Sequence, residues 1–173
     1  MKKFVALLRG INVGGHKKVP MKELKTLLEK EGFQSVKTLL ASGNVIFESD
    51  EKKIGEVQSI LEDHFGFSIH TIVLPFEVIE KIVASDPFKG IEVTPKTRFY
   101  ITFSQGKLES DLKTPYVFDD ESFQILKLTD HEIFSVLNLE QMGSVDAMKI
   151  LQQAFGKKIT TRSYNTVLKI AQL

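Results

Sequence analysis

The chain has 173 residues, of which 42% are hydrophobic, and a formal net charge of +1 at pH 7. This length suits one ordinary domain or two small ones, and the composition excludes wholesale disorder and a strongly basic nucleic-acid-binding protein. The absence of cysteine excludes disulfides, thiolate metal sites and cysteine nucleophiles, and it fits a reducing compartment.

Positive charge is concentrated in the first part of the chain. Residues 1–50 carry nine Lys or Arg and five Asp or Glu, a net charge of +4, so the remaining residues carry −3. A polyanionic partner and an ordinary solvated surface both fit this asymmetry. The apolar run before Arg9 is too short for a signal peptide, and no stretch approaches the length of a membrane span. We therefore expect a cytoplasmic protein with no membrane partner.

The first half of the chain predicts strands and helices in the order βαββαβ. The expected strands cover residues 3–9, 35–41, 44–48 and 68–74. One helix opens at Pro20 and ends before Gly32, and the other, capped by Ser49 or Asp50, ends at Gly66. This order is typical of a ferredoxin-like unit.

The second half predicts a less regular α+β unit. Strands are expected at 97–103, 122–128 and 131–136, an irregular or weakly helical stretch at 106–113, and helices at 144–155 and 162–171. We expect a domain over 1–84 that includes a short helix from 76 to 84, a linker over 85–96 with two prolines, and a second domain over 97–173.

The most distinctive segment follows the first predicted strand and reads Arg9-Gly-Ile-Asn-Val-Gly-Gly15. A βαββαβ sheet has the strand order 4-1-3-2, which brings this loop to the same edge as the turn Ser42–Asn44. The first helix also begins at that edge, after His16-Lys17-Lys18. Free backbone amides, cations and a helix N-terminus all favour an anion, so the sequence predicts an anion site here.

The candidate ligand-binding residues come from three segments. They are Arg9, Gly10, Asn12, Gly14, Gly15, Ser42, Gly43 and Asn44, with Arg162 from the second half. Arg9 would give charge-assisted hydrogen bonds, the polar side chains would orient the ligand, and the glycines would permit close approach. The loop matches neither G-x-x-x-x-G-K-[ST] nor G-x-G-x-x-G, and no cofactor is predicted. A purely structural alternative also fits, because glycine and Ser-Gly-Asn are ordinary turn formers.

The C-terminal Thr160-Thr161 is interpreted as a helix cap, with Arg162 in the first helical turn. A cation there opposes the helix dipole, which suggests that Arg162 serves a carboxylate on the first half or a bound anion. The alternative is a cap that docks the two halves together.

Four short blocks of this sequence resemble one bacterial family. They are Leu7-Leu-Arg-Gly-Ile-Asn-Val-Gly-Gly15, Val19-Pro-Met21, Ala41-Ser-Gly-Asn-Val45, and Thr160-Thr-Arg162 with Asn165-Thr-Val167. On these blocks the chain resembles, over almost its whole length, the family catalogued as domain of unknown function 1697. The family has no established activity, so the resemblance implies only that the first loop, the Ser-Gly-Asn turn and the Thr-Thr-Arg segment belong together. The family commonly has asparagine and tryptophan after the arginine, where this chain has Ser163-Tyr164, so a role for an indole is not carried over.

Other chemistry-bearing residues give weaker patterns. The four histidines, His16, His64, His70 and His131, lack metal-ligand spacing. The run Asp119-Asp120-Glu121 is interpreted as a solvated turn, with a metal-assisted hydrolase site as the alternative. Ser42 lies in no G-x-S-x-G elbow, and no RNP-type aromatic motif is present.

Three functional hypotheses follow from the sequence. The first is a module that binds a phosphate-bearing ligand, nucleotide or nucleic acid at residues 9–15 and 42–44. The second is a transferase or hydrolase of a phosphorylated small molecule using the same pocket; no general base is evident, and His70 and Asp86 are the candidates. In the third, the motifs only lock the two halves together. The oligomeric state does not follow from the sequence.

Overall fold

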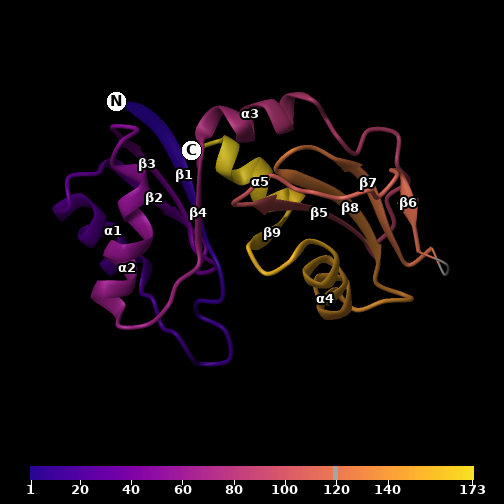
Figure 1. The fold of residues 1–173 in the computed structure, drawn as a ribbon, viewed down its shortest axis with the longest axis horizontal. Coiled ribbons are helices and arrows are strands. Elements are labelled where there is room, and N and C mark those ends of the chain that lie inside the picture. Colours follow the sequence, from indigo (N-terminus) through magenta and orange to yellow (C-terminus); the bar gives the residue numbers. More distant parts are fainter. Residues whose placement is uncertain (119–120) are drawn as a thin grey trace. The chain divides into compact units, whose positions relative to one another are not determined.

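The computed structural model describes residues 1–118 and 121–173. Within these residues the protein is a mixed α+β structure with two antiparallel sheets and five α-helices (Figure 1), which confirms the predicted α+β class. The chain forms two compact units, one comprising 1–82 with 170–173 and the other 83–169. The proposed division at the linker 85–96 stays a prediction.

The sheet of the first unit has the strand order that the sequence argument requires. Its strands are β1 (Lys2–Leu8), β2 (Gln34–Leu39), β3 (Asn44–Ser49) and β4 (Thr71–Pro75). They are ordered β2-β3-β1-β4, and every neighbouring pair is antiparallel. Read from the other edge this is the expected order 4-1-3-2. The end of β1 therefore lies beside the start of β3.

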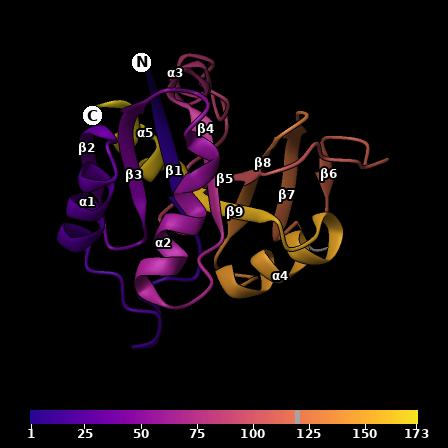
Figure 2. The same ribbon diagram turned by 60° about the vertical axis from the view of Figure 1, so that its left-hand side comes forward.

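Two helices cover one face of this sheet (Figure 2): α1 (Met21–Lys30) and α2 (Val57–Phe65). The strand residues facing them alternate along β1 and β3, and they pack against the apolar stripes of both helices. This core comprises Phe4, Ala6, Leu8, Val45 and Phe47 from the strands and Leu24, Leu28, Val57 and Leu61 from the helices. The whole run Phe4–Leu8 is buried, which explains why β1 appears in the sequence as a continuous apolar segment.

Both predicted helix ends are confirmed, but one predicted helix start is wrong. Gly66 directly follows α2 and Gly32 lies one residue beyond the C-cap Glu31 of α1, with positive φ angles of +75° and +86° respectively. The second helix begins at Val57, after a 3-10 turn over Ile54–Glu56 (η1), rather than at a Ser49 or Asp50 cap. The Asp50 carboxylate instead accepts the N–H of Lys52 at 3.0 Å, so it stabilises the turn that follows β3.

The segment after β4 begins as predicted with a helix, α3 (Phe76–Ala84). Residues 85–96 contain no helix or strand. They are nevertheless packed, because the buried ring of Phe88 stacks on Phe99 with centroids 4.5 Å apart. The predicted linker is thus partly a covering segment of the second unit.

The second unit contains a five-stranded sheet in the order β6-β7-β8-β5-β9. Its strands are β5 (Thr97–Ser104), β6 (Tyr116–Val117), β7 (Phe123–Leu128), β8 (Glu132–Asn138) and β9 (Ile159–Ser163). Helix α4 (Ser144–Phe155) contributes Ala147 and Leu151 to a core with residues of β7 and β8. Helix α5 (Tyr164–Ala171) follows β9 directly.

The prediction for this unit is correct for residues 106–113 and wrong near the C-terminal end. Residues 106–113 are irregular, which is one of the two predicted alternatives, whereas the segment interpreted as a helix cap is the strand β9. Thr160 and Thr161 are β-branched, and they pair with Phe103 and Thr102 of β5. The hydroxyls of Thr102 and Thr161 are 2.7 Å apart, so the strand pairing supplies a cross-strand hydrogen bond in addition to the ladder.

Among the helices that the structure describes, none has both the length and the apolar character that a membrane-spanning helix requires.

Candidate functional site

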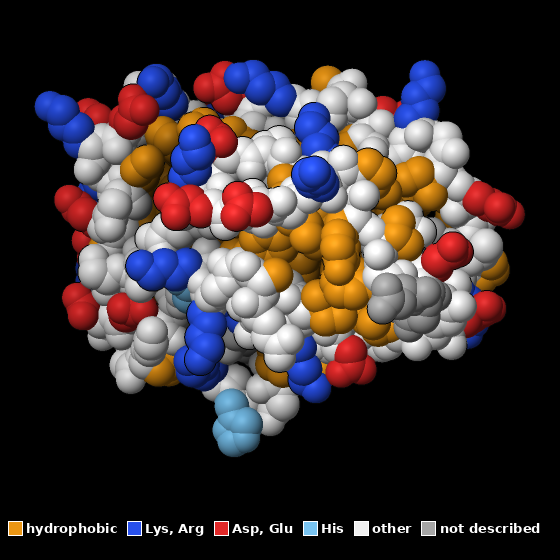
Figure 3. Space-filling view, turned by 45° about the vertical axis from the view of Figure 1, so that its right-hand side comes forward, with side chains coloured by type: hydrophobic (Ala, Val, Ile, Leu, Met, Phe, Trp, Pro, Cys, Tyr) orange, Lys and Arg blue, Asp and Glu red, His pale blue; other side chains and the backbone are white. Residues whose placement is uncertain are grey.

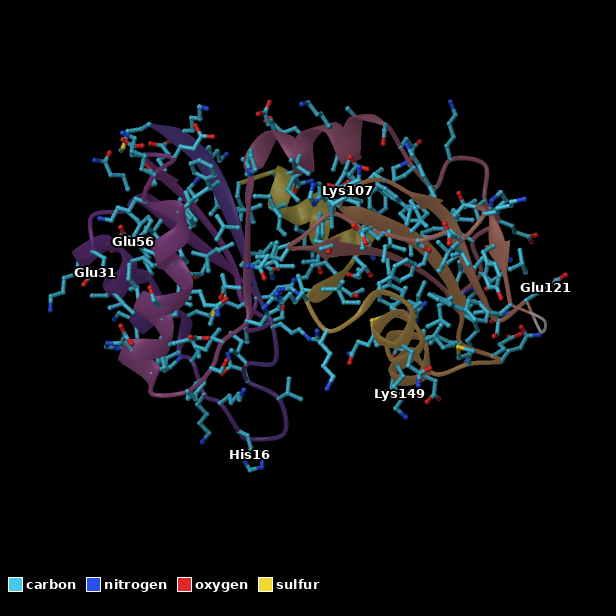
Figure 4. All side chains as sticks on the ribbon, viewed as in Figure 1. His16, Glu31, Glu56, Lys107, Glu121 and Lys149 are labelled. Atoms are coloured by element: carbon cyan, nitrogen blue, oxygen red, sulfur yellow. The ribbon has the colours of Figure 1, made fainter. Side chains whose placement is uncertain are left out.

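The loop between β1 and α1, residues 9–19, forms an exposed finger at one edge of the first unit. Its tip is a short hairpin in which the N–H of His16 donates to the carbonyl of Val13 at 3.1 Å. Figure 4 shows His16 at the outer end of this finger, directed away from the sheet. Gly10, Gly14 and Gly15 have positive φ angles, as do Asn12 and Lys17. The turns of the finger therefore require several residues in the left-handed backbone conformation, which glycine adopts most readily.

Asn12 holds this loop in shape. Its side-chain Nδ2 donates to the carbonyls of Val19 at 3.0 Å and Ala41 at 2.8 Å, and its Oδ1 accepts the N–H of Val19 at 2.8 Å. The two bonds with Val19 close the base of the finger, and the bond to Ala41 ties it to the β2–β3 turn. Both N–H groups of the amide are used, so Asn12 acts as a structural clamp in this geometry.

Gly43 lies where the turn and the end of β1 come closest. Its carbonyl accepts the N–H of Leu8 at 2.8 Å. A Cβ atom at this position would lie 2.7 Å from the Cβ of Leu8 and 2.8 Å from the Cδ1 of Ile11, and the φ angle is +81°. Only glycine satisfies both the backbone conformation and the contact distance.

Asn44 stabilises the same turn from inside the unit. It is fully buried, and its Nδ2 donates to the carbonyl of Leu39 at 2.8 Å and to the Oγ of Ser42 at 3.2 Å. The exposed Ser42 is thus oriented by Asn44. The structure brings the two predicted segments together, as the topology required, through the contacts of Leu8 with Gly43 and of Asn12 with Ala41.

The remaining predicted residues of the loop face open space. A Cβ atom on Gly10 or Gly15 would meet nothing within 4 Å, and one on Gly14 would meet only the His16 ring at 4.0 Å. Within residues 1–118 and 121–173, the backbone N–H groups of Gly14 and Gly15 donate to no protein acceptor. These glycines leave room and donors for an approaching group.

The charge of the loop is of one sign. Arg9, Lys17 and Lys18 lie in it, and the first carboxylate in the sequence is Glu23. The ammonium of Lys17 donates to the carbonyl of Ser68 at 3.0 Å, which anchors the finger to the segment before β4. The backbone N–H of Arg9 donates to the carbonyl of His70 at 2.9 Å. On the upper part of the face shown in Figure 3, by contrast, Lys and Arg side chains lie among Asp and Glu side chains.

Arg162 is placed differently from the prediction. It lies in β9 opposite Ile101, not in a helical turn, so the argument from the helix dipole does not apply. Its guanidinium donates to the Oγ1 of Thr160 at 2.9 Å and to the carbonyl of Thr161 at 3.0 Å. Burial, with 8% of the residue exposed, lowers the pKa of Arg162 from its usual range to about 10. Its participation in the loop site stays a prediction.

A groove of about 480 Å³ on the first unit was missed by the sequence reasoning. It is lined by Pro20, Lys22, Glu23, Thr26, Leu27, Lys30 and His64. The Nε2 of His64 and the Oε1 of Glu23 are 2.8 Å apart and join α2 to α1 across it. The signal in the sequence was the spacing of Lys22, Thr26 and Lys30, which places three polar residues along one line of α1 beside Leu27.

Metal-ligand geometry is not found in the described residues, which contain no group of three His, Asp or Glu side chains that could hold a metal ion. Asp119 and Asp120, from the predicted acidic turn, lie outside the described residues. Glu121 is exposed and has a positive φ angle of 55°.

Comparison with known families assigns the chain to one of them. Residues 1–134 match the family described as "Protein of unknown function (DUF1697)". The chain belongs to this family. The matched residues include the finger, the Ser-Gly-Asn turn and the groove, which are all in the first unit. The Thr160–Arg162 block of the predicted resemblance lies beyond the matched residues. Membership thus confirms the predicted family and assigns no activity.

A solved structure shares the fold. The conserved bacterial protein SP0830 from Streptococcus pneumoniae superposes with a TM-score of 0.70 at 22% sequence identity. The similarity covers 98% of this chain and 97% of that one, so this member of the family shares its fold with SP0830 over both units. No curated protein matches the chain.

Proposed function

We propose that the first unit is a cytoplasmic binding module that holds a phosphate-bearing anion on the finger, residues 9–19. The observation that carries this proposal is an exposed loop with three cations, no carboxylate and backbone N–H groups at Gly14 and Gly15 that donate to no acceptor among the described residues. Amides and cations on a concave or flexible loop are the groups that bind phosphate oxygens in proteins.

The predicted residues divide into two roles. Asn12, Gly43 and Asn44 shape the edge, because their bonding capacity and close contacts are directed into the protein. Lys17 and Lys18 supply charge, and the open glycines permit approach of the phosphate. Arg9, which is half-buried at the base of the finger, would add a charge-assisted hydrogen bond.

The two alternatives receive less support. An enzyme needs a positioned general base. Of the two candidates, Asp86 belongs to the second unit, and the half-buried His70 lies directly before β4, where its backbone carbonyl accepts the N–H of Arg9. A purely structural role accounts for Asn12 and Asn44. It does not account for a run of cations on an exposed loop, since solvated lysines contribute little to stability.

Neutralising the two lysines of the finger tests the proposal. We expect Lys17→Gln combined with Lys18→Gln to weaken binding of inorganic pyrophosphate about tenfold, measured by calorimetry at low salt, because two favourable charge contacts are lost. For a single-stranded oligonucleotide, the slope of log affinity against log salt should fall by about 1.4, two lost contacts at about 0.7 each.

The matched control is Lys89→Gln combined with Lys113→Gln, which removes the same charge from exposed positions outside the first unit. If both double variants bind pyrophosphate equally well, the finger is not the anion site. Circular dichroism checks that the loss of the Lys17–Ser68 hydrogen bond has not unfolded the protein.

A further inference from the structure

The groove between α1 and α2 adjoins the finger. Pro20, which lines it, follows Lys18 by two residues, and Lys17 reaches the carbonyl of Ser68, four residues beyond the groove residue His64. Figure 2 shows α1 and α2 side by side on the face of the sheet. A ligand with a phosphate on the cations at the base of the finger could therefore extend into this groove.

The groove carries an excess of positive charge. Its lining contains two lysines, Lys22 and Lys30, and one carboxylate, Glu23, which lies 2.8 Å from the Nε2 of His64. Among the described residues, Lys22 and Lys30 have no carboxylate within ion-pair distance. They are two helical turns apart, about 12 Å along α1. The groove therefore favours an anionic ligand.

The lining also contains the groups that a heterocycle needs. Leu27, Pro20 and the half-exposed His64 ring offer apolar and stacking surface. The second carboxylate oxygen of Glu23 can accept an amino N–H, and the Thr26 hydroxyl, which donates to the carbonyl of Lys22 at 3.1 Å, retains lone pairs. A nucleobase can form hydrogen bonds with these remaining acceptors, whereas a lipid chain cannot. The volume of about 480 Å³ lies within the usual range for small-molecule sites.

We propose that the groove holds the base of a nucleotide whose phosphate is bound by the finger. This inference rests on the proposed function of the finger and assigns its ligand to the nucleotide class. Lys17 and Lys18 contact the phosphate, Lys22 and Lys30 raise the local positive potential, and Glu23 and Thr26 read the edge of the base.

Filling the groove tests the assignment. Thr26→Trp places a large ring in it from an exposed helical position, and we expect the affinity for AMP to fall about tenfold, the loss that follows when a base loses its stacking surface. The affinity for inorganic pyrophosphate, which has no base, should stay within twofold. Both affinities are measured by calorimetry on the full chain.

Two control variants keep the result interpretable. Ser59→Trp adds the same side chain to α2 at an exposed position that does not line the groove, and Thr26→Ala removes the hydroxyl without filling space. Both should bind AMP within about threefold of the original chain. Thermal unfolding of Thr26→Trp checks that the variant is folded.

Each outcome bears on one claim. If Thr26→Trp binds AMP normally, or loses AMP and pyrophosphate equally, the nucleotide assignment is wrong. Binding of a medium-chain fatty acid in the groove without AMP binding overturns it as well. Failure of the finger proposal has a different signature, since pyrophosphate binding would then survive the Lys17→Gln and Lys18→Gln changes.

Discussion

Gly43→Ala is expected to lower the free energy of unfolding by about 3 kcal/mol. The added methyl would lie 2.7 Å from the Cβ of Leu8 and 2.8 Å from Ile11, both fully or almost fully buried. The Leu8 Cβ is fixed by the strand β1, so the contact cannot be relieved by a rotamer change. Overpacking of a core costs about 1–3 kcal/mol, and a non-glycine residue in left-handed backbone costs about 1–2 kcal/mol more.

Gly15→Ala is the matched control for this substitution. Gly15 has a similar φ angle, +76° against +81°, but its Cβ would meet nothing within 4 Å. The variant should therefore lose only the backbone contribution, about 1 kcal/mol. Urea unfolding of both variants measures the difference. Equal losses would show that the close approach of the turn to β1 has no energetic importance.

The arrangement of the sheet edge formed by the finger and the Ser-Gly-Asn turn can be predicted from sequence. The apolar strand before Arg9, the helix that ends at Gly32 and the hairpin before Asn44 predict the strand order, and the order brings the finger and the turn together. These elements depend on local signals, namely hydrophobic periodicity and glycine at left-handed positions, which act over a few residues. The convergence of two segments about thirty residues apart was thus predictable.

The role of each residue at the edge was not predictable in the same way. The sequence shows that Asn12 and Asn44 are polar, but not that both amide N–H groups of each are donated to the protein. Hydrogen-bond partners depend on tertiary distances of a few tenths of an ångström, which pattern and propensity do not encode. The sequence predicted which segments converge at this edge, and the structure distinguishes the residues that shape it from the glycines that face open space.

The C-terminal segment shows where local signals are ambiguous. Thr160 and Thr161 fit both a helix cap and an edge strand, since threonine caps helices and also favours β-structure. Pairing with β5 decides between the two, and β5 lies nearly sixty residues earlier in the sequence. The same tertiary context places Arg162 on a strand and buries it, a result that no property of residues 159–163 indicates alone.

Asn12→Ala is expected to lower the free energy of unfolding by about 2 kcal/mol, because three hydrogen bonds at the base of the finger are lost and each contributes about 0.5–1.5 kcal/mol. The exposure of Asn12 to solvent keeps the loss at the lower end, since water can replace some partners. Asn165→Ala, at an exposed position of α5, is the matched control and should change stability by less than about 0.5 kcal/mol.

Asn12→Asp separates the donor role of this amide from its acceptor role. Aspartate keeps the oxygen that accepts the N–H of Val19 but places a carboxylate oxygen against the carbonyls of Val19 and Ala41. The variant should therefore be at least as unstable as Asn12→Ala at pH 7, while hydrogen exchange at the Val19 amide should remain slower than in Asn12→Ala. Exchange at Val19 that is equally fast in both variants would show that the acceptor bond does not hold the finger. If the finger binds phosphate as proposed, loss of the Asn12 bonds at its base should displace Lys17 and Lys18, so both variants should also weaken pyrophosphate binding. Unaltered binding in a variant with an open base would mean that the cations act without the clamp.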